Sequence, residues 1–126
     1  KLSLNELMQY IEASSNVDKE LITYYANEMK LNIKENLNKS FFKLSGGMKQ
    51  KMLIAISLAK KSNIIIYDEP TANLDPKARD DFYRLLKQNE DDKILLFVTH
   101  RLDEVKEIVN RQIYMDLGKI ISDERV

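Results

Sequence analysis

The stretch LSGGMKQ, residues 44–50, organises the rest of this chain. It opens a segment, 48–59, in which apolar residues recur at the three-and-four spacing of one helix face. Ser45 is a favourable N-cap, and Gly46 and Gly47 leave the first helical amides uncovered by side chains. Free N–H groups and the positive end of the helix dipole favour an anion such as a phosphate. An ordinary capped helix after a turn would show the same pattern, so this stretch alone leaves both interpretations open.

A short apolar, β-branched run follows at residues 64–67 and ends on two acids, Asp68 and Glu69. It is typical of a parallel strand buried on both faces, and ligands bind at the carboxyl ends of such strands. Two adjacent carboxylates are costly to bury there without a cation or a proton. Because strand side chains alternate, Asp68 and Glu69 are expected to point in different directions. The alternative is that these acids cap the next loop or pair with lysines.

A second buried strand is predicted over residues 93–98, ending on Thr99 and on His100, the only histidine of the chain. A helix is expected from 102 to 109. If the two strands are neighbours, His100 lies near the two acids, although a lone histidine is more often structural.

The remaining elements follow from turn and cap residues. Asp75 and Pro76 mark the start of a helix that should run to about residue 88. A hairpin is predicted from segments 113–117 and 119–122 around Gly118.

Two amphipathic helices are expected before the glycine pair, over residues 4–13 and 18–29. Ser3 and Glu6 form a capping box for the first of them. The aromatic pair at 41–42 is expected in the core, and stacking on a nucleotide base is the alternative.

Four of these elements, in this order and spacing, resemble the ATP-binding cassette (ABC) ATPase family, over nearly the whole chain from about residue 2 to 121. Residues 44–50 are similar to its signature motif, 64–69 to its Walker B strand with the adjoining glutamate, 72–75 to its D-loop, and His100 to its switch histidine. The resemblance implies an α/β, P-loop NTPase-like fold that is only partial. A helical subdomain (1–62) would contain the signature motif and its helix. The carboxyl-terminal part of the ATPase core (63–126) would contain parallel strands with flanking helices and a β-hairpin.

The resemblance also implies roles for individual residues. Asp68 would hold Mg²⁺, Glu69 would polarise the attacking water, and His100 would contact the γ-phosphate and orient Glu69. The residues expected to contact ATP are Ser45, Gly46, Gly47, Gln50 and Asp75. The loop that carries Asp75 would cross to a facing subunit, and Asp75 can at the same time be a helix cap.

No Walker A pattern, G-x-x-x-x-G-K-[ST], occurs in this sequence. The chain therefore resembles the carboxyl-terminal portion of an ABC ATPase, either a fragment or half of a split protein. By itself it is expected to be inactive and to leave one edge or face of its sheet exposed. The family implies two partners, a second ABC ATPase domain and a transmembrane permease, and a peripheral location on the cytoplasmic face of the membrane.

Composition reduces the number of possible partners, metal sites and protein classes. The 126 residues are 44% hydrophobic and 32% charged with zero formal net charge, so bulk charge gives no reason to expect a nucleic-acid partner. The chain has no cysteine, which excludes disulfides and thiolate metal sites. Two alternatives to a transporter subunit are a non-transport ABC ATPase, acting in translation or chromosome maintenance, and a degenerate regulatory cassette. The absence of sustained heptads disfavours a coiled-coil chromosome ATPase, and the presence of Glu69 and His100 disfavours the degenerate cassette.

Overall fold

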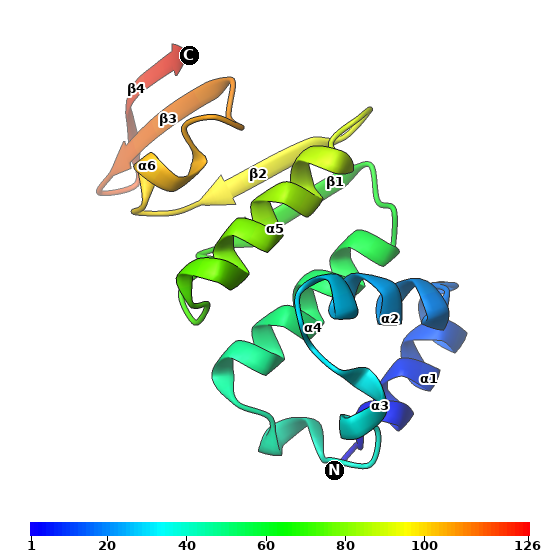
Figure 1. Cartoon of the computed structure of the whole chain (residues 1–126). Coiled ribbons are helices and arrows are strands. Elements are labelled where there is room, and N and C mark those ends of the chain that lie inside the picture. The colour runs from blue at the N-terminus through cyan, green and yellow to red at the C-terminus, as the bar shows by residue number, and fades with distance from the viewer.

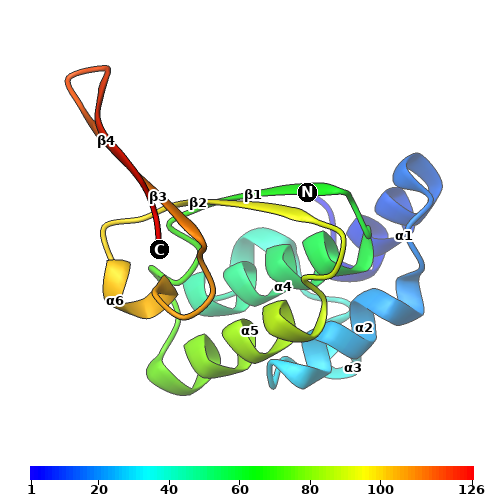
Figure 2. The same ribbon diagram turned by 90° about the horizontal axis from the view of Figure 1, so that it is seen from above.

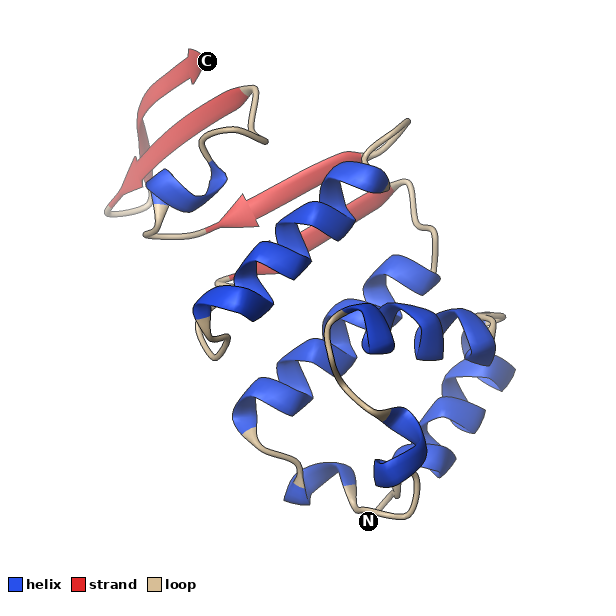
Figure 3. Cartoon of the chain, viewed as in Figure 1, coloured by secondary structure: helices blue, strands red, loops and turns tan.

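The structure is a computed structural model that describes all residues from 1 to 126. Helices come first, and strands alternate with helices after them (Figures 1 and 3). The elements are α1 (Leu4–Ser15), α2 (Lys19–Glu28), α3 (Ile33–Asn36), the 3-10 turn η1 (Phe41–Lys43), α4 (Gly46–Ala59), β1 (Ile64–Asp68), α5 (Pro76–Gln88), β2 (Ile94–Val98), α6 (Leu102–Val105), β3 (Arg111–Asp116) and β4 (Lys119–Arg125). The predicted α/β fold class, with its helical first part, parallel strands and final hairpin, is confirmed.

The helix starts are fixed by the caps that the sequence predicts. Ser3 Oγ accepts the Glu6 N–H at 3.2 Å and so caps α1. The Ser3 hydroxyl also donates to the Glu6 carboxylate at 3.0 Å, in place of the backbone N–H that donates in a complete capping box. Helix α1 continues two residues beyond the expected end and stops at Asn16, whose φ of 53° is left-handed. Helix α6 is shorter than predicted, because the amides of Ile108 and Val109 both bond the Val105 carbonyl in a turn.

Strands β1 and β2 pair in parallel, with Ile64 opposite Ile94 and Asp68 opposite Val98, and α5 connects them. Helices α4 and α5 lie on the same side of this two-stranded sheet (Figure 2). Tyr67 points to that side, where its ring stacks on Phe97 and meets Phe82 of α5 edge-on.

The other face of this sheet is open, so the prediction of strands buried on both sides is wrong for this chain. Aliphatic side chains remain about half exposed or more on it because no helix covers that side; they are Ile64, Ile66, Ile94, Leu96 and Val98. The separate expectation of an exposed sheet face agrees with this arrangement.

One hydrophobic core of 22 buried residues runs from Leu4 to Leu86, through both of the parts expected from the sequence. Helix α4 lies at its centre, between α2 and β1. Ile54 and Leu58 are therefore buried in addition to the predicted face, on which Met52, Ala55 and Ala59 are buried. The division at residue 62 stays a prediction.

Two peripheral regions differ from expectation. Phe41 packs partly against the core, but Phe42 is 68% exposed and is not the core anchor predicted, because the 3-10 turn directs only one ring of the pair inward. The hairpin β3–β4 is longer than predicted and turns at Leu117 and Gly118, both with positive φ. It extends away from the parallel sheet (Figure 2).

Candidate functional site

The carboxyl ends of β1 and β2 lie side by side and bring the predicted acids and the histidine together. Asp68 ends β1 on its open face and is exposed. Glu69 leaves the strand, because its φ of 45° is left-handed, while its N–H still bonds the Val98 carbonyl at 2.8 Å. The two acids thus have different surroundings, and the cause is this backbone turn rather than strand alternation alone.

The loop after β2 holds the Glu69 carboxylate. Oε1 accepts the backbone N–H of His100 at 3.0 Å, and Oε2 accepts the Thr99 hydroxyl at 3.4 Å. The His100 imidazole is 98% exposed, and its Nε2 lies 3.7 Å from Glu69 Oε1. The carboxylate is therefore fixed by its own neighbours while the imidazole stays free to meet a ligand. The hydrogen bond from Thr99 to Glu69 was not predicted from the sequence. The position of Thr99 directly before His100, at the end of the second strand, was the signal that could have indicated it.

The glycine pair begins α4 as expected. Ser45 Oγ accepts the Met48 N–H at 3.1 Å, which makes Ser45 the N-cap. The amides of Gly46 and Gly47 precede the first intrahelical bond and have no protein acceptor.

The loop after β1 packs directly on this glycine pair. A Cβ on Gly47 would lie 3.0 Å from the Asn73 carbonyl oxygen, and one on Gly46 would lie 3.6 Å from the Asn73 side chain. The sequence suggested only phosphate access as the reason for glycine here. The structure adds a second reason, which is the close approach of the 72–75 loop to the start of α4.

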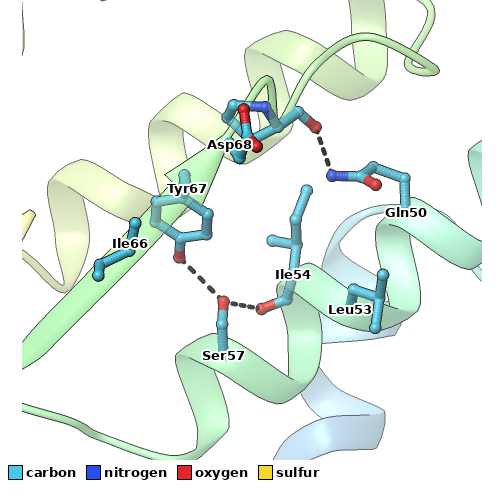
Figure 4. A pocket seen from close by; sticks show the side chains of 8 residues that line it. Gln50, Leu53, Ile54, Ser57, Ile66, Tyr67 and Asp68 are labelled. Atoms are coloured by element: carbon cyan, nitrogen blue, oxygen red, sulfur yellow. Dashed lines mark hydrogen bonds between the residues drawn. The ribbon is translucent and has the colours of Figure 1, made fainter. Parts of the chain in front are cut away.

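Gln50 and Asp75 each have a structural partner. Gln50 Nε2 donates to the Pro70 carbonyl at 2.8 Å and so ties α4 to the loop after β1 (Figure 4). Asp75 Oδ1 accepts the Ala78 N–H at 2.8 Å and caps α5, as its position before a proline predicts. A contact of either residue with ATP stays a prediction.

A shallow groove of about 250 Å³ separates α4 from β1 beside Asp68 (Figure 4). Across it, the Tyr67 hydroxyl lies 2.9 Å from Ser57 Oγ, which itself donates to the Ile54 carbonyl at 2.7 Å. Because the Ser57 hydroxyl gives its one proton to the Ile54 carbonyl, the Tyr67 hydroxyl is the donor in the bond between them. Burial raises the pKa of Tyr67. This bond links the helix of the glycine pair to the strand that ends on Asp68.

The side chains present would fit a magnesium ion held partly by water and by a substrate, and not a site built from protein ligands alone. The structure has no group of three or more histidine or acidic side chains that could hold a metal ion, and Asp68 stands as a single exposed carboxylate. Mg²⁺ is commonly held by one or two carboxylates together with water and substrate phosphates. A lone Asp68 suits that mode, in which a nucleotide supplies the remaining oxygens.

Comparison with known sequences decides the family. The sequence profile of a family described as ABC transporter matches residues 3–72, more than half of the chain. This chain belongs to the ABC transporter family. The match begins at the N-cap of α1 and includes the glycine pair, Asp68 and Glu69 of this ABC chain; it ends before Asp75 and His100.

Relatives of this ABC chain carry transporter names. It is 42% identical over 103 residues to the energy-coupling factor transporter ATP-binding protein EcfA2 of Mycoplasmoides gallisepticum. The aligned region covers 81% of this chain and 32% of that protein. The chain thus spans about a third of the length of this curated relative.

Solved structures confirm the fold. A structure of an ATP-binding subunit of an ABC transporter superposes with a TM-score of 0.84 at 20% identity, over 100% of this chain and 54% of that one. The dimeric structure of a bacterial ABC transporter cassette gives a TM-score of 0.82 at 26% identity, over 98% of this chain and 56% of that one. No helix of this ABC chain is both long and apolar enough to cross a membrane.

Proposed function

We propose that this chain is the carboxyl-terminal part of an ABC transporter ATP-binding subunit, which binds and hydrolyses ATP to drive transport by a membrane partner. The observation that carries the proposal is the Glu69 carboxylate, held by the His100 amide at 3.0 Å at the carboxyl end of a parallel strand. A carboxylate fixed by two donors, with an exposed imidazole beside it, is suited to orient water toward a phosphate.

Each predicted residue then has one task. Glu69 takes the proton of the attacking water, a general-base role that typically contributes about 10²–10⁴ in rate. The exposed His100 imidazole contacts the γ-phosphate and keeps its place beside Glu69. Mg²⁺, held through Asp68, would neutralise charge on the transferred phosphoryl group.

The free amides of Gly46 and Gly47, with Ser45, would serve a second ATP. This pair begins α4, whereas Glu69 follows β1, and Asn73 of the loop of residues 72–75 packs on the glycine pair. In a head-to-tail pair of ATPase domains, this glycine pair would contact the ATP gripped by the partner's P-loop. The dimeric form of one structural neighbour supports that arrangement.

The open face of the β1–β2 sheet fits a chain that is completed by other residues. Its exposed aliphatic side chains would be covered by the part of the cassette that carries the P-loop. The share of solved cassettes that this chain covers, about half, supports this view. The permease would bind elsewhere, on the helical part around α1 to α3, and the whole subunit would lie on the cytoplasmic face of the membrane.

The alternatives are weaker. A degenerate regulatory cassette has no need of the contacts that hold Glu69 against the loop of His100. A non-transport ABC ATPase would use the same site chemistry, but the curated relative described above is named as a transporter protein. No observation on the site favours a degenerate regulatory cassette or a non-transport ABC ATPase over a transporter subunit.

The decisive experiment replaces Glu69 by glutamine in the complete cassette. The amide keeps the shape but cannot accept a proton, so steady-state ATP turnover should fall by at least about 10² while ATP binding persists. Glu107→Gln is the matched control, because Glu107 is exposed and makes no side-chain hydrogen bond or ion pair. Turnover of Glu69→Gln within about threefold of the parent would contradict the general-base role.

A further inference from the structure

The carboxylate of Glu104, on α6, is the meeting point of four side-chain donors from three other places in the chain. It accepts the Thr71 hydroxyl at 2.8 Å, Arg79 Nη1 at 2.7 Å, Arg101 Nη1 at 3.1 Å and the Tyr83 hydroxyl at 3.2 Å. No other carboxylate of the chain has as many side-chain donors. Sequence spacing did not predict this cluster.

The electrostatics indicate that Glu104 is ionised in the folded chain at neutral pH. Its side chain is only 15% exposed, and burial by itself would raise its pKa. The four hydrogen bonds outweigh burial and hold the pKa at about 2. Glu104 pairs with Arg79 Nη1 at 2.7 Å, and the buried Nε of Arg79 has no hydrogen-bond partner.

The donors of Glu104 come from the two loops that build the site around Glu69. Thr71 lies two residues after Glu69, in the loop whose Ala72 amide bonds the Glu69 carbonyl at 3.2 Å. Arg101 directly follows His100, and its N–H bonds the Thr99 hydroxyl that donates to the Glu69 carboxylate. One anion thus holds the loop after β1 and the loop after β2 on the same point of α6.

We propose that Glu104 is a positioning residue for hydrolysis, which sets the place of His100 relative to the Glu69 carboxylate by holding Thr71 and Arg101. This rests on the proposed ATPase function. Glu104 acts through other residues and touches no reacting atom. A purely structural role, in which Glu104 only anchors α6 on Arg79 and Tyr83 of α5, is the alternative.

The test uses the complete cassette and two variants at neighbouring positions. Glu104→Gln keeps the shape and removes the charge, and Asp103→Asn is the matched control because Asp103 is exposed and makes no side-chain hydrogen bond. A misplaced catalytic group commonly costs up to about 10²-fold, so kcat of Glu104→Gln should fall about tenfold or more. KM for ATP should stay within about twofold, because the interaction lost is one made in the transition state. Asp103→Asn should match the parent.

A double-mutant cycle separates positioning from simple stabilisation. If Glu104 acts through His100, Glu104→Gln should lower kcat by less than about twofold in a His100→Ala background. A full, multiplicative loss in that background would overturn the proposal. Thr71→Val is the second variant if Glu104→Gln folds poorly, because it leaves the Arg79–Glu104 ion pair in place. It should show a smaller loss of kcat than Glu104→Gln, again at constant KM.

Amide hydrogen exchange gives a measurement that does not depend on turnover. The His100 N–H is bonded to Glu69, so its protection should fall in Glu104→Gln and Thr71→Val but not in Asp103→Asn. Unchanged protection of His100 in both variants would overturn the proposal even if kcat falls. If the parent cassette does not hydrolyse ATP, the proposed function fails, and this exchange measurement still decides whether Glu104 positions His100.

Discussion

Acid titration of Glu104 should dominate the difference in stability between this chain and its Glu104→Gln variant. The pKa of Glu104 is lowered from its ordinary value of 4.5 to about 2 by hydrogen bonds from Thr71, Arg79, Arg101 and Tyr83, against the opposing effect of burial. A carboxyl with a lowered pKa stabilises the folded state above its unfolded pKa. That contribution is lost as the pH falls toward the folded pKa.

The magnitude follows from the size of the shift. One pKa unit corresponds to about 1.4 kcal/mol, so a shift from 4.5 to about 2 corresponds to at most about 3 kcal/mol. Above about pH 5 the parent should therefore be more stable than Glu104→Gln by up to that amount. The advantage should shrink between pH 4.5 and 2 and vanish below it.

Urea unfolding of both proteins at a series of pH values measures this difference. Both proteins share all other carboxylates, including Asp123, whose pKa is lowered chiefly by a hydrogen bond from Arg111. They contribute equally to both proteins and cancel. If the free energies of unfolding of the parent and of Glu104→Gln fall in parallel as the pH is lowered, the reasoning is refuted. Asp103→Asn should show the same pH dependence of the free energy of unfolding as the parent.

Three further predictions concern the glycine pair and the chain alone. Ser45→Arg should block the ATP-bound dimer of the Glu69→Gln cassette in gel filtration without unfolding it; undiminished dimerisation would contradict the signature assignment. Gly47→Ala should lower the free energy of unfolding by about 1–3 kcal/mol, because its Cβ would press on the Asn73 carbonyl at 3.0 Å. Gly46→Ala, whose Cβ would make ordinary contacts, should cost less, and equal losses in chemical denaturation would contradict this prediction. The 126-residue chain alone should not hydrolyse Mg-ATP and should bind it no tighter than about millimolar, because a helix N-terminus without a P-loop gives about −4 kcal/mol at best; a low micromolar Kd by calorimetry would oppose this.

Local chemistry made much of the fold predictable. The caps at Ser3, Ser45 and Asp75 depend on residues within three positions, so sequence spacing alone places them. The parallel pairing of the strands could also be predicted, because a helix-length crossover with Pro76 at its start separates two apolar runs.

Features that depend on distant partners could not be predicted. The open sheet face and the exposed ring of Phe42 result from what packs nearby, which a periodicity pattern does not contain. The approach of Asn73 to the glycines joins segments that are far apart in the sequence. Three of the four donors on Glu104, which are Thr71, Arg79 and Tyr83, lie 21 or more residues from it. Glu69 and His100 were predicted to meet only on the condition that their strands are neighbours.

The left-handed backbone of Glu69 has a consequence for how this protein responds to selection. A residue with a Cβ in that conformation costs about 1–2 kcal/mol, which glycine avoids. Glutamine carries the same cost as glutamate, so Glu69→Gln removes the proton acceptor and leaves the backbone energy unchanged. Glu69→Gly would relieve the backbone and, with the proposed general base removed, abolish turnover as well. Libraries sorted for thermal tolerance alone will therefore drift toward inactive proteins at this position, and only a screen that demands turnover will retain the acid.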